Sequence, residues 1–349
     1  MTKVLVFGTG SLGACYAWVF AKAVGEKNVT AICRSNYAVA SRDGFTIHSK
    51  LWGDNLRFHP RVAKSVAEAV EEQGNGVFDF VVIAAKALPT RPSTADLIAP
   101  AVMTGKTAIV LIQNGIGIED EYAARFPHNP VLSTVAYFPA TQVRPGVVLH
   151  REVELLHVGT YPAASVAPPA HSEAATAFAD LIARGGATAK LHDDVQRERW
   201  AKLLVNGAWN PVCAVTRLRD REFIEANCDL GLGSNEGGEV SSKSKGDGLQ
   251  FIKDVMLEIA AVAQAYGYAD IDEALVDSQI GRAAVRELPG IQPSMLADAF
   301  EGRSMEVDAI VGNAVRMART KGVPVPMLTT IYVLANGLSW GFARGKGVD

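Results

Sequence analysis

The stretch "VLVFGTGSLGACYA", residues 4–17, constrains the fold of this 349-residue chain more than any other segment. It sets Gly8, Gly10 and Gly13 in G-x-G-x-x-G spacing between an apolar run typical of a buried strand and a segment of helical periodicity. Gly8 permits a tight turn, Gly10 lets the backbone approach a pyrophosphate, and Gly13 lets the helix pack closely on the strand. Amide groups at the helix start then face an anion. We predict a dinucleotide site, the alternative being a purely structural glycine-rich turn.

Three more apolar runs, "VTAIC" (29–33), "DFVVIAA" (79–85) and "TAIVLI" (107–112), predict buried strands separated by segments that can hold helices. This alternation indicates an α/β fold with a Rossmann-type, doubly wound parallel sheet. Residues 130–138 and 146–161 add strand patterns without a long helix between them, which predicts an antiparallel extension.

The chain exceeds the length at which a single core usually stops growing, so two domains are expected. Long helical patterns dominate after "LHDDVQRERW" (191–200), and we place the boundary near residue 190, giving a Rossmann-like domain 1–190 and an all-helical C-terminal domain 191–349. Residues 229–248 are rich in Gly, Ser and charge, which predicts a flexible insertion, with an active-site lid as the alternative.

Composition indicates the cellular compartment and the kinds of partner to expect. A net charge of -3 gives no electrostatic reason to expect a nucleic acid or a membrane partner, and no apolar run approaches 18 residues. The four Cys show no C-x-x-C spacing and the seven His are scattered singly, so reduced thiols are expected rather than disulfides or zinc. We therefore expect a soluble cytoplasmic protein without a metal site. Its oligomeric state is left open, a homodimer included.

Polar residues follow the carboxyl ends of the predicted strands, and ligands bind parallel α/β sheets at these ends. After the second strand the chain carries "CRSN" where an NAD site would offer Asp or Glu. Arg34 can pair with a 2'-phosphate, with donors added by Ser35 or Asn36, which predicts NADP(H); the alternative is an ordinary surface Arg. Lys86 can reach phosphate or ribose and Asn114 the nicotinamide ribose. Their alternatives are a solvated Lys and a simple Asn-Gly turn.

"RWAKLLVNGAWNP" (199–211) interrupts an apolar segment with Lys202, Asn206 and Asn210, each four residues after the last. In a helix this spacing sets one ammonium and two amides on a single face, which favours a polar ligand opposite them over a merely solvated face. Pro211 predicts a kink or an end of the helix.

Another segment, "QPSMLADAFEGRSMEVDAIVGNAVRMARTKGVPVP", begins at residue 292. An apolar stripe at helical spacing puts Glu306 at its edge rather than fully in water. Ser294, which follows a proline, is read from its position alone as a helix N-cap.

Five motifs together carry a resemblance to a known family. "GTGSLG", "AKA" (85–87), "QNG" (113–115), "KLLVNGAWNP" (202–211) and "PSMLADAFEGRSMEVDAIVG" (293–312) resemble those of 2-dehydropantoate 2-reductases, also called ketopantoate reductases, in the same order over most of the chain. The resemblance implies a Rossmann domain followed by a helical domain, with the active site in the cleft between them.

The resemblance also implies residue roles. Lys202 would be the proton donor, Asn206 and Asn210 would hold the substrate, Ser294 would contact its carboxylate or hydroxyl, and Glu306 would help to bind cofactor and substrate. The implied NADP(H) site comprises Gly8, Thr9, Gly10, Ser11, Leu12, Gly13, Arg34, Lys86 and Asn114.

The implied activity is NADPH-dependent reduction of 2-dehydropantoate to pantoate, a step of pantothenate biosynthesis, with a small-molecule 2-oxo acid as substrate. Two alternatives stay open: a reductase of another branched 2-oxo acid or lactone, and a non-catalytic NADP(H)-binding redox sensor. The chain departs from compact bacterial members in two places. Asp220 stands where those members have a further substrate-contacting Asn, and residues 229–248 look like an insertion close by.

Overall fold

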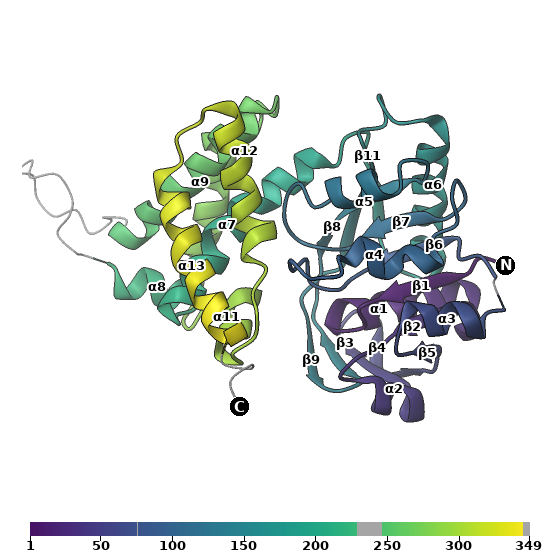
Figure 1. The fold of residues 1–349 in the computed structure, drawn as a ribbon. Helices are drawn as coiled ribbons and strands as arrows, with labels where there is room; N and C mark the ends of the chain where they lie inside the picture. The colour runs from purple at the N-terminus through teal and green to yellow at the C-terminus, as the bar shows by residue number, and fades with distance from the viewer. Residues whose placement is uncertain (75, 229–245, 345–349) are drawn as a thin grey trace, which may run out of the picture. The chain divides into compact units, whose positions relative to one another are not determined.

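The computed structural model describes residues 1–74, 76–228 and 246–344, and its chain divides into two compact units (Figure 1). The first comprises Met1–Asn114 and Ile118–Glu198, and the second Gly115–Gly117 and Arg199–Asp349. The sequence places the boundary near residue 190, whereas the contacts divide the chain between Glu198 and Arg199. They also assign the short segment Gly115–Gly117 to the second unit.

The first unit is built on an eight-stranded sheet of order β12-β11-β8-β7-β6-β1-β2-β5. Its strands are β1 (Val4–Phe7), β2 (Val29–Ile32), β5 (Arg61–Ala63), β6 (Phe80–Ile83), β7 (Ala108–Leu111), β8 (Val131–Tyr137), β11 (Leu155–Tyr161) and β12 (Ala189–Leu191). All pairs are parallel except β8 with β11. Every residue of β1, β2, β6 and β7 is buried, as both-face coverage requires. The predicted Rossmann-type sheet is confirmed.

The order in which the strands are added makes this sheet doubly wound. From β1 the chain passes through α1 (Ser11–Val24) to β2 on one side, and from β6 through α4 (Thr94–Ile98) to β7 on the other. Right-handed crossovers in opposite directions put α1 and α4 on opposite faces. Helix α6 (Pro169–Arg184) packs against α1. The remaining helices of this unit are η1 (Glu26–Asn28), α2 (Tyr37–Asp43), α3 (Val66–Glu72), η2 (Ala99–Ala101) and α5 (Asp120–Arg125).

A second, four-stranded sheet of order β4-β3-β10-β9 belongs to the same unit. It comprises β3 (Phe45–Ser49), β4 (Gly53–Phe58), β9 (Ala140–Arg144) and β10 (Val147–His150). The antiparallel extension expected from residues 146–161 is therefore split, because β10 joins this sheet, parallel to β3, while β11 pairs antiparallel with β8. The polar run 151–154 separates the two strands.

All regular elements in the described part of the second unit are helical (Figure 1), which confirms the expected fold class. They are α7 (Gln196–Thr216), whose first turn lies in the first unit, α8 (Asp220–Ala226), α9 (Asp247–Ala265), α10 (Glu273–Ala284), α11 (Ser294–Phe300), the π-helical turn η3 (Asp308–Gly312), α12 (Asn313–Lys321) and α13 (Pro326–Arg344). Most of the segment 229–248 lies outside the described residues. Its last residues, Asp247 and Gly248, begin α9.

Pro211 does not end α7. The helix runs through it to Thr216, although a proline removes one ladder hydrogen bond and crowds the carbonyl of Gly207. All residues from Gly207 to Ala214 are buried, so packing of this stretch offsets the lost bond.

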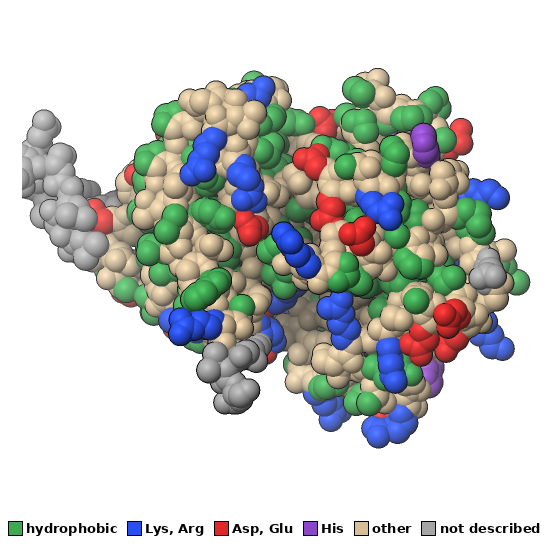
Figure 2. Space-filling model, in the orientation of Figure 1, with side chains coloured by type: hydrophobic (Ala, Val, Ile, Leu, Met, Phe, Trp, Pro, Cys, Tyr) green, Lys and Arg blue, Asp and Glu red, His purple; other side chains and the backbone are tan. Residues whose placement is uncertain are grey.

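Charged side chains of both signs are interspersed on the face of each unit shown in Figure 2. Within the described residues, the helices all fall short of the length and apolarity that crossing a membrane requires.

Candidate active site

The glycine-rich turn has the geometry that the sequence predicts, and its three glycines are required for different reasons. Gly8 has a φ of +94°, and a Cβ there would lie 2.4 Å from the backbone nitrogen of Ala85. A Cβ on Gly13 would lie 2.0 Å from the carbonyl oxygen of Gly8, so the close approach of α1 to the turn excludes any side chain. At Gly10, φ is -74° and a Cβ would meet no described atom within 4 Å. The protein itself does not require glycine at position 10, and space for a bound group remains there.

Side chains around the turn fix its backbone. Thr9 is buried, and its hydroxyl donates to the carbonyl oxygen of Ile32 at 3.0 Å. The amide nitrogen of Asn36 donates to the carbonyl oxygen of Thr9 at 2.8 Å. The Ser11 hydroxyl accepts a 2.8 Å bond from the backbone N–H of Gln142. Asn36 therefore braces the glycine turn from within the protein. Donation by Ser35 or Asn36 to a 2'-phosphate stays a prediction.

The polar residues predicted after the strands lie along one edge of the large sheet. Strands β7, β6, β1 and β2 are neighbours in that order and run parallel, so their carboxyl ends share an edge. Asn114, Lys86, the glycine turn and Arg34 follow these ends. The direction in which successive strands are added to the sheet reverses between β1 and β6, and such a switch point is where α/β sheets bind ligands. Arg34 is exposed, with its guanidinium carbon 5.6 Å from the centre of the Phe7 ring.

The second unit carries the predicted polar face of α7. Lys202, Asn206 and Asn210 occupy successive turns of one continuous helix, so they project from one side of it. Lys202 and Asn206 are half-buried, and Asn210 is buried. Their neighbours Leu203, Leu204, Ala208 and Trp209 are buried in the core of the unit. The face is therefore embedded in apolar surroundings and is not a solvated edge of the helix.

Burial and charged groups of the same unit set the protonation state of Lys202. Burial and the positive charge of Arg199 lower the pKa of Lys202 to about 8, while the negative charge of Glu306 opposes this shift. Glu306 is itself buried, and its backbone carbonyl accepts from the backbone N–H of Ile310, in the middle of η3. Arg199 is 3% exposed and donates to the carbonyl oxygen of Gly115 at 2.9 Å. The result is a lysine that is mostly charged at pH 7 and loses its proton as the pH rises through about 8.

Asn210 and Ser294 are brought together although 84 residues separate them in the chain. The Ser294 hydroxyl donates to Oδ1 of Asn210 at 3.0 Å, and the backbone N–H of Met295 donates to the same oxygen at 3.1 Å. Ser294 is the first residue of α11 and makes no capping bond, since the N-cap is Pro293. The N-cap interpretation of Ser294 is wrong, because Asn210 supplies the acceptor for the first backbone donors of α11.

Asp220, one of the two departures noted in the sequence, serves a structural purpose. It is buried, forms an ion pair with Arg286, and accepts from the backbone N–H groups of Arg221 at 2.7 Å and Ile291 at 2.6 Å. These bonds hold the loop that leads into α11.

Arg199 is the residue that sequence reasoning missed. It lies one turn before Lys202, but a buried Arg has the same sequence signature as a solvated one, so only the fold reveals it.

Comparison with known proteins gives the family. Two family models match separate parts of the chain: ketopantoate reductase PanE/ApbA over residues 4–163, and ketopantoate reductase PanE/ApbA C terminal over residues 238–339. The chain belongs to the ketopantoate reductase family. It is thus an oxidoreductase of the class that acts on CH–OH groups with a nicotinamide cofactor.

Individual relatives resemble this member of the family along nearly its whole length. A 2-dehydropantoate 2-reductase of Nostoc is 23% identical over 337 residues, covering 95% of this chain and 93% of the relative. The crystal structure of 2-dehydropantoate 2-reductase from Methylococcus capsulatus is 28% identical, with a TM-score of 0.78 and 97% of each chain covered. D-Mandelate dehydrogenase, solved with NADH and anilino(oxo)acetate, has a TM-score of 0.77 at 18% identity, which shows a shared fold.

Asp308 and Gly312, two further residues of the motif at 293–312, have structural roles. Asp308 accepts from the Tyr332 hydroxyl at 2.9 Å and from Arg316 at 3.1 Å. A Cβ on Gly312 would lie 2.7 Å from an Asp308 carboxylate oxygen and 2.8 Å from the Tyr332 ring. The pair holds α13 against η3, directly after Glu306.

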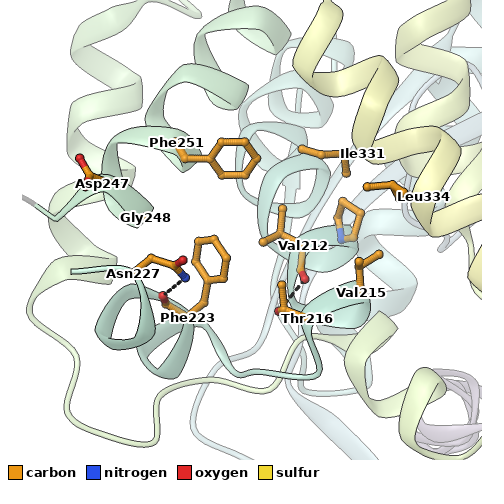
Figure 3. Close-up of a pocket in the computed structure, with 11 residues that line it drawn as sticks. Val212, Val215, Thr216, Phe223, Asn227, Asp247, Gly248, Phe251, Ile331 and Leu334 are labelled. Carbon is orange, nitrogen blue, oxygen red and sulfur yellow. Dashed lines mark hydrogen bonds between the residues drawn. The ribbon is translucent and has the colours of Figure 1, made fainter. Parts of the chain in front are cut away.

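The second unit also contains an apolar cavity of about 350 Å³ beside the C-terminal part of α7 (Figure 3). Val212, Phe223, Phe251 and other side chains line it. The hydrogen-bonding groups of its polar members Thr216 and Asn227 are directed to backbone carbonyls at 2.8 Å. Lys202, Asn206, Asn210, Ser294 and Glu306 are not among its described lining residues. Its apolar lining does not suit a charged oxo acid, so we keep it apart from the candidate active site.

Proposed function

We propose that this protein reduces 2-dehydropantoate to pantoate with NADPH, and that Lys202 is the proton donor. The observation that carries the proposal is the state of Lys202, whose pKa of about 8 leaves it charged at neutral pH yet able to release a proton. An acid is most effective when its pKa lies near the working pH.

Each predicted site residue of the second unit then has a role in the reaction. The cofactor, when bound, supplies a hydride to the keto carbon. The Lys202 ammonium stabilises the negative charge that develops on the carbonyl oxygen and then protonates that oxygen. The side chains of Asn206, Asn210 and Ser294 hold the substrate carboxylate or hydroxyl without changing charge. Glu306 keeps Lys202 more protonated than burial alone would allow.

We propose NADPH rather than NADH as the cofactor. Open space at Gly10 fits a pyrophosphate, which supports a dinucleotide at the turn. Arg34 follows β2 and is exposed, so its guanidinium is available for the charge-assisted bonds that a 2'-phosphate forms.

A second candidate function, reduction of another branched 2-oxo acid, is favoured by one observation. Asp220 stands where compact members have a substrate-contacting Asn, and it is engaged by Arg286 and by backbone donors instead. The proposal therefore assigns no substrate contact to that position, and the substrate can differ there.

One experiment separates these functions. NADPH oxidation is followed with a panel of 2-oxo acids that includes 2-dehydropantoate, for the wild type, Lys202→Ala and the exposed-lysine control Lys321→Ala. We expect 2-dehydropantoate to be the best substrate and Lys202→Ala to lose about 10²- to 10⁴-fold in kcat, with NADPH binding retained. A better substrate would support the second candidate. Oxidation with none of them would support a sensor, and near-normal turnover of Lys202→Ala would refute the mechanism.

We also propose that the protein forms a homodimer through α13. Val333 and Trp340 lie two turns apart on this helix, so they share a face, and each is 62% exposed. Large exposed apolar groups gathered on one helix are typical of a contact surface. Sedimentation analysis should show a dimer for the wild type and a monomer for Trp340→Glu; a monomeric wild type would contradict the assignment.

A further inference from the structure

The first unit brings together two histidines and a glutamate that the reduction does not use. His157 lies on β11, His192 directly follows β12, and Glu198 lies in the first turn of α7. Their candidate ligand atoms all lie within 4.8 Å of one another. We propose that His157, His192 and Glu198 form a binding site for a divalent transition-metal ion of the zinc class.

The sheet explains how residues so distant in sequence meet. Strands β11 and β12 pair in parallel, with Val158 opposite Leu191, and the backbone N–H of His192 donates to the carbonyl oxygen of Val158 at 2.9 Å. This register sets the imidazoles side by side, with ring centres 4.8 Å apart. Because the two histidines lie 35 residues apart in the chain, sequence spacing predicted no metal site.

The donor atoms already point at one another. Nδ1 of His157 lies 2.7 Å from Nε2 of His192 and 3.9 Å from Oε2 of Glu198. The other carboxylate oxygen of Glu198 pairs with Arg197 at 3.0 Å, which orients Oε2 towards His157. The edge of the Tyr137 ring packs on His157 at 5.7 Å between ring centres and restricts its rotation. Supporting contacts of this kind hold ligands in place around protein-bound metals.

Two imidazole nitrogens and one carboxylate oxygen are a ligand set that zinc uses, with a fourth position left for water. Tetrahedral ligation with bonds of about 2.0–2.1 Å needs ligand nitrogens roughly 3.3 Å apart. The 2.7 Å separation between the histidines is that of a hydrogen bond, so the rings must separate by roughly 0.6 Å. His192 is half-buried on a connecting segment and can make this adjustment. Each neutral ring then carries its proton on the nitrogen that faces away from the metal.

The test uses full-length protein without an affinity tag, freed of metal by chelation and then titrated with Zn²⁺ in a calorimeter. The wild type is compared with His192→Gln and Glu198→Gln, which keep side-chain size, and with His128→Gln, which alters an exposed histidine outside the cluster. We expect about one Zn²⁺ per chain for the wild type and His128→Gln, and at least a tenfold weaker affinity for the other two variants.

A second measurement reports the coordination geometry of the bound metal ion. Co²⁺ added in place of Zn²⁺ should give the intense visible absorption of tetrahedral cobalt in the wild type and lose it in His192→Gln. Circular dichroism shows that each variant is folded. Absence of Zn²⁺ binding by the wild type would overturn the proposal, and so would equal affinity in the wild type, His192→Gln and Glu198→Gln. Either result would leave the cluster as a hydrogen-bonded pair beside a carboxylate.

Discussion

The lowered pKa of Lys202 predicts how the rate of reduction depends on pH. Its pKa is lowered from 10.5 to about 8, and the acid that donates the proton is the charged form. The reduction rate must therefore fall as pH rises through about 8. The ammonium is roughly 90% populated at pH 7 and roughly 10% at pH 9, so kcat/KM should drop about tenfold between them. An unshifted lysine would leave this range nearly flat.

The assay measures kcat/KM for the oxo acid at saturating NADPH over this pH range, in the wild type, Glu306→Gln and Glu301→Gln. Glu306 raises the pKa of Lys202, so its neutralisation should move the alkaline decline to lower pH. Glu301 is exposed on the same connecting segment, and its variant should match the wild type. Oxidation of the alcohol, which needs neutral Lys202, should rise over the pH range in which reduction falls. A flat wild-type profile up to pH 10, or an unchanged decline in Lys202→Arg, would refute the reasoning.

Five further variants, at four positions, test the two units. Gly10→Ala should change the free energy of unfolding by less than about 0.5 kcal/mol yet weaken NADPH binding, because only a ligand needs that space. Gly13→Ala, whose methyl group would overlap a backbone oxygen, should destabilise the fold by about 1–3 kcal/mol in denaturant titrations; equal stabilities would contradict this contrast. Arg34→Ala should weaken NADPH about tenfold or more and NADH little, as measured by fluorescence titration, and equal losses would dismiss its phosphate role. Asn210→Ala should cost about 1–3 kcal/mol in urea unfolding and raise KM, while Asn210→Asp, which keeps the acceptor for Ser294, should recover much of the stability.

The sequence predicts those features that depend on neighbours along the chain. The glycine turn is one, because strand, glycines and helix are consecutive, and Gly8 and Gly13 each meet a demand of the backbone at the turn. The polar face of α7 is another, since helical spacing alone sets Lys202 and Asn210 on one side. The parallel sheet follows from the alternation of strands and helices.

Other features depend on contacts that no local pattern encodes. The bond between Asn210 and Ser294 joins two helices far apart in the chain, so the local N-cap interpretation of Ser294 fails. Buried Arg199 lowers the pKa of Lys202, yet its sequence context matches that of a surface residue. The second sheet arises because β10 pairs with β3 across a hundred residues of chain, which no periodicity indicates.

The assignment of Gly115–Gly117 to the helical unit limits how this protein can be dissected. Ile116 is 1% exposed in the helical core, its N–H donates to the Ala309 carbonyl, and its own carbonyl accepts from Asn313. A fragment ending at Glu198 would contain this tripeptide without the helical residues that it packs against. A fragment starting at Arg199 would lack part of its own core. We therefore expect neither half to be a self-sufficient module, and an exchange of helical units between relatives must include three residues from the middle of the first unit's sequence.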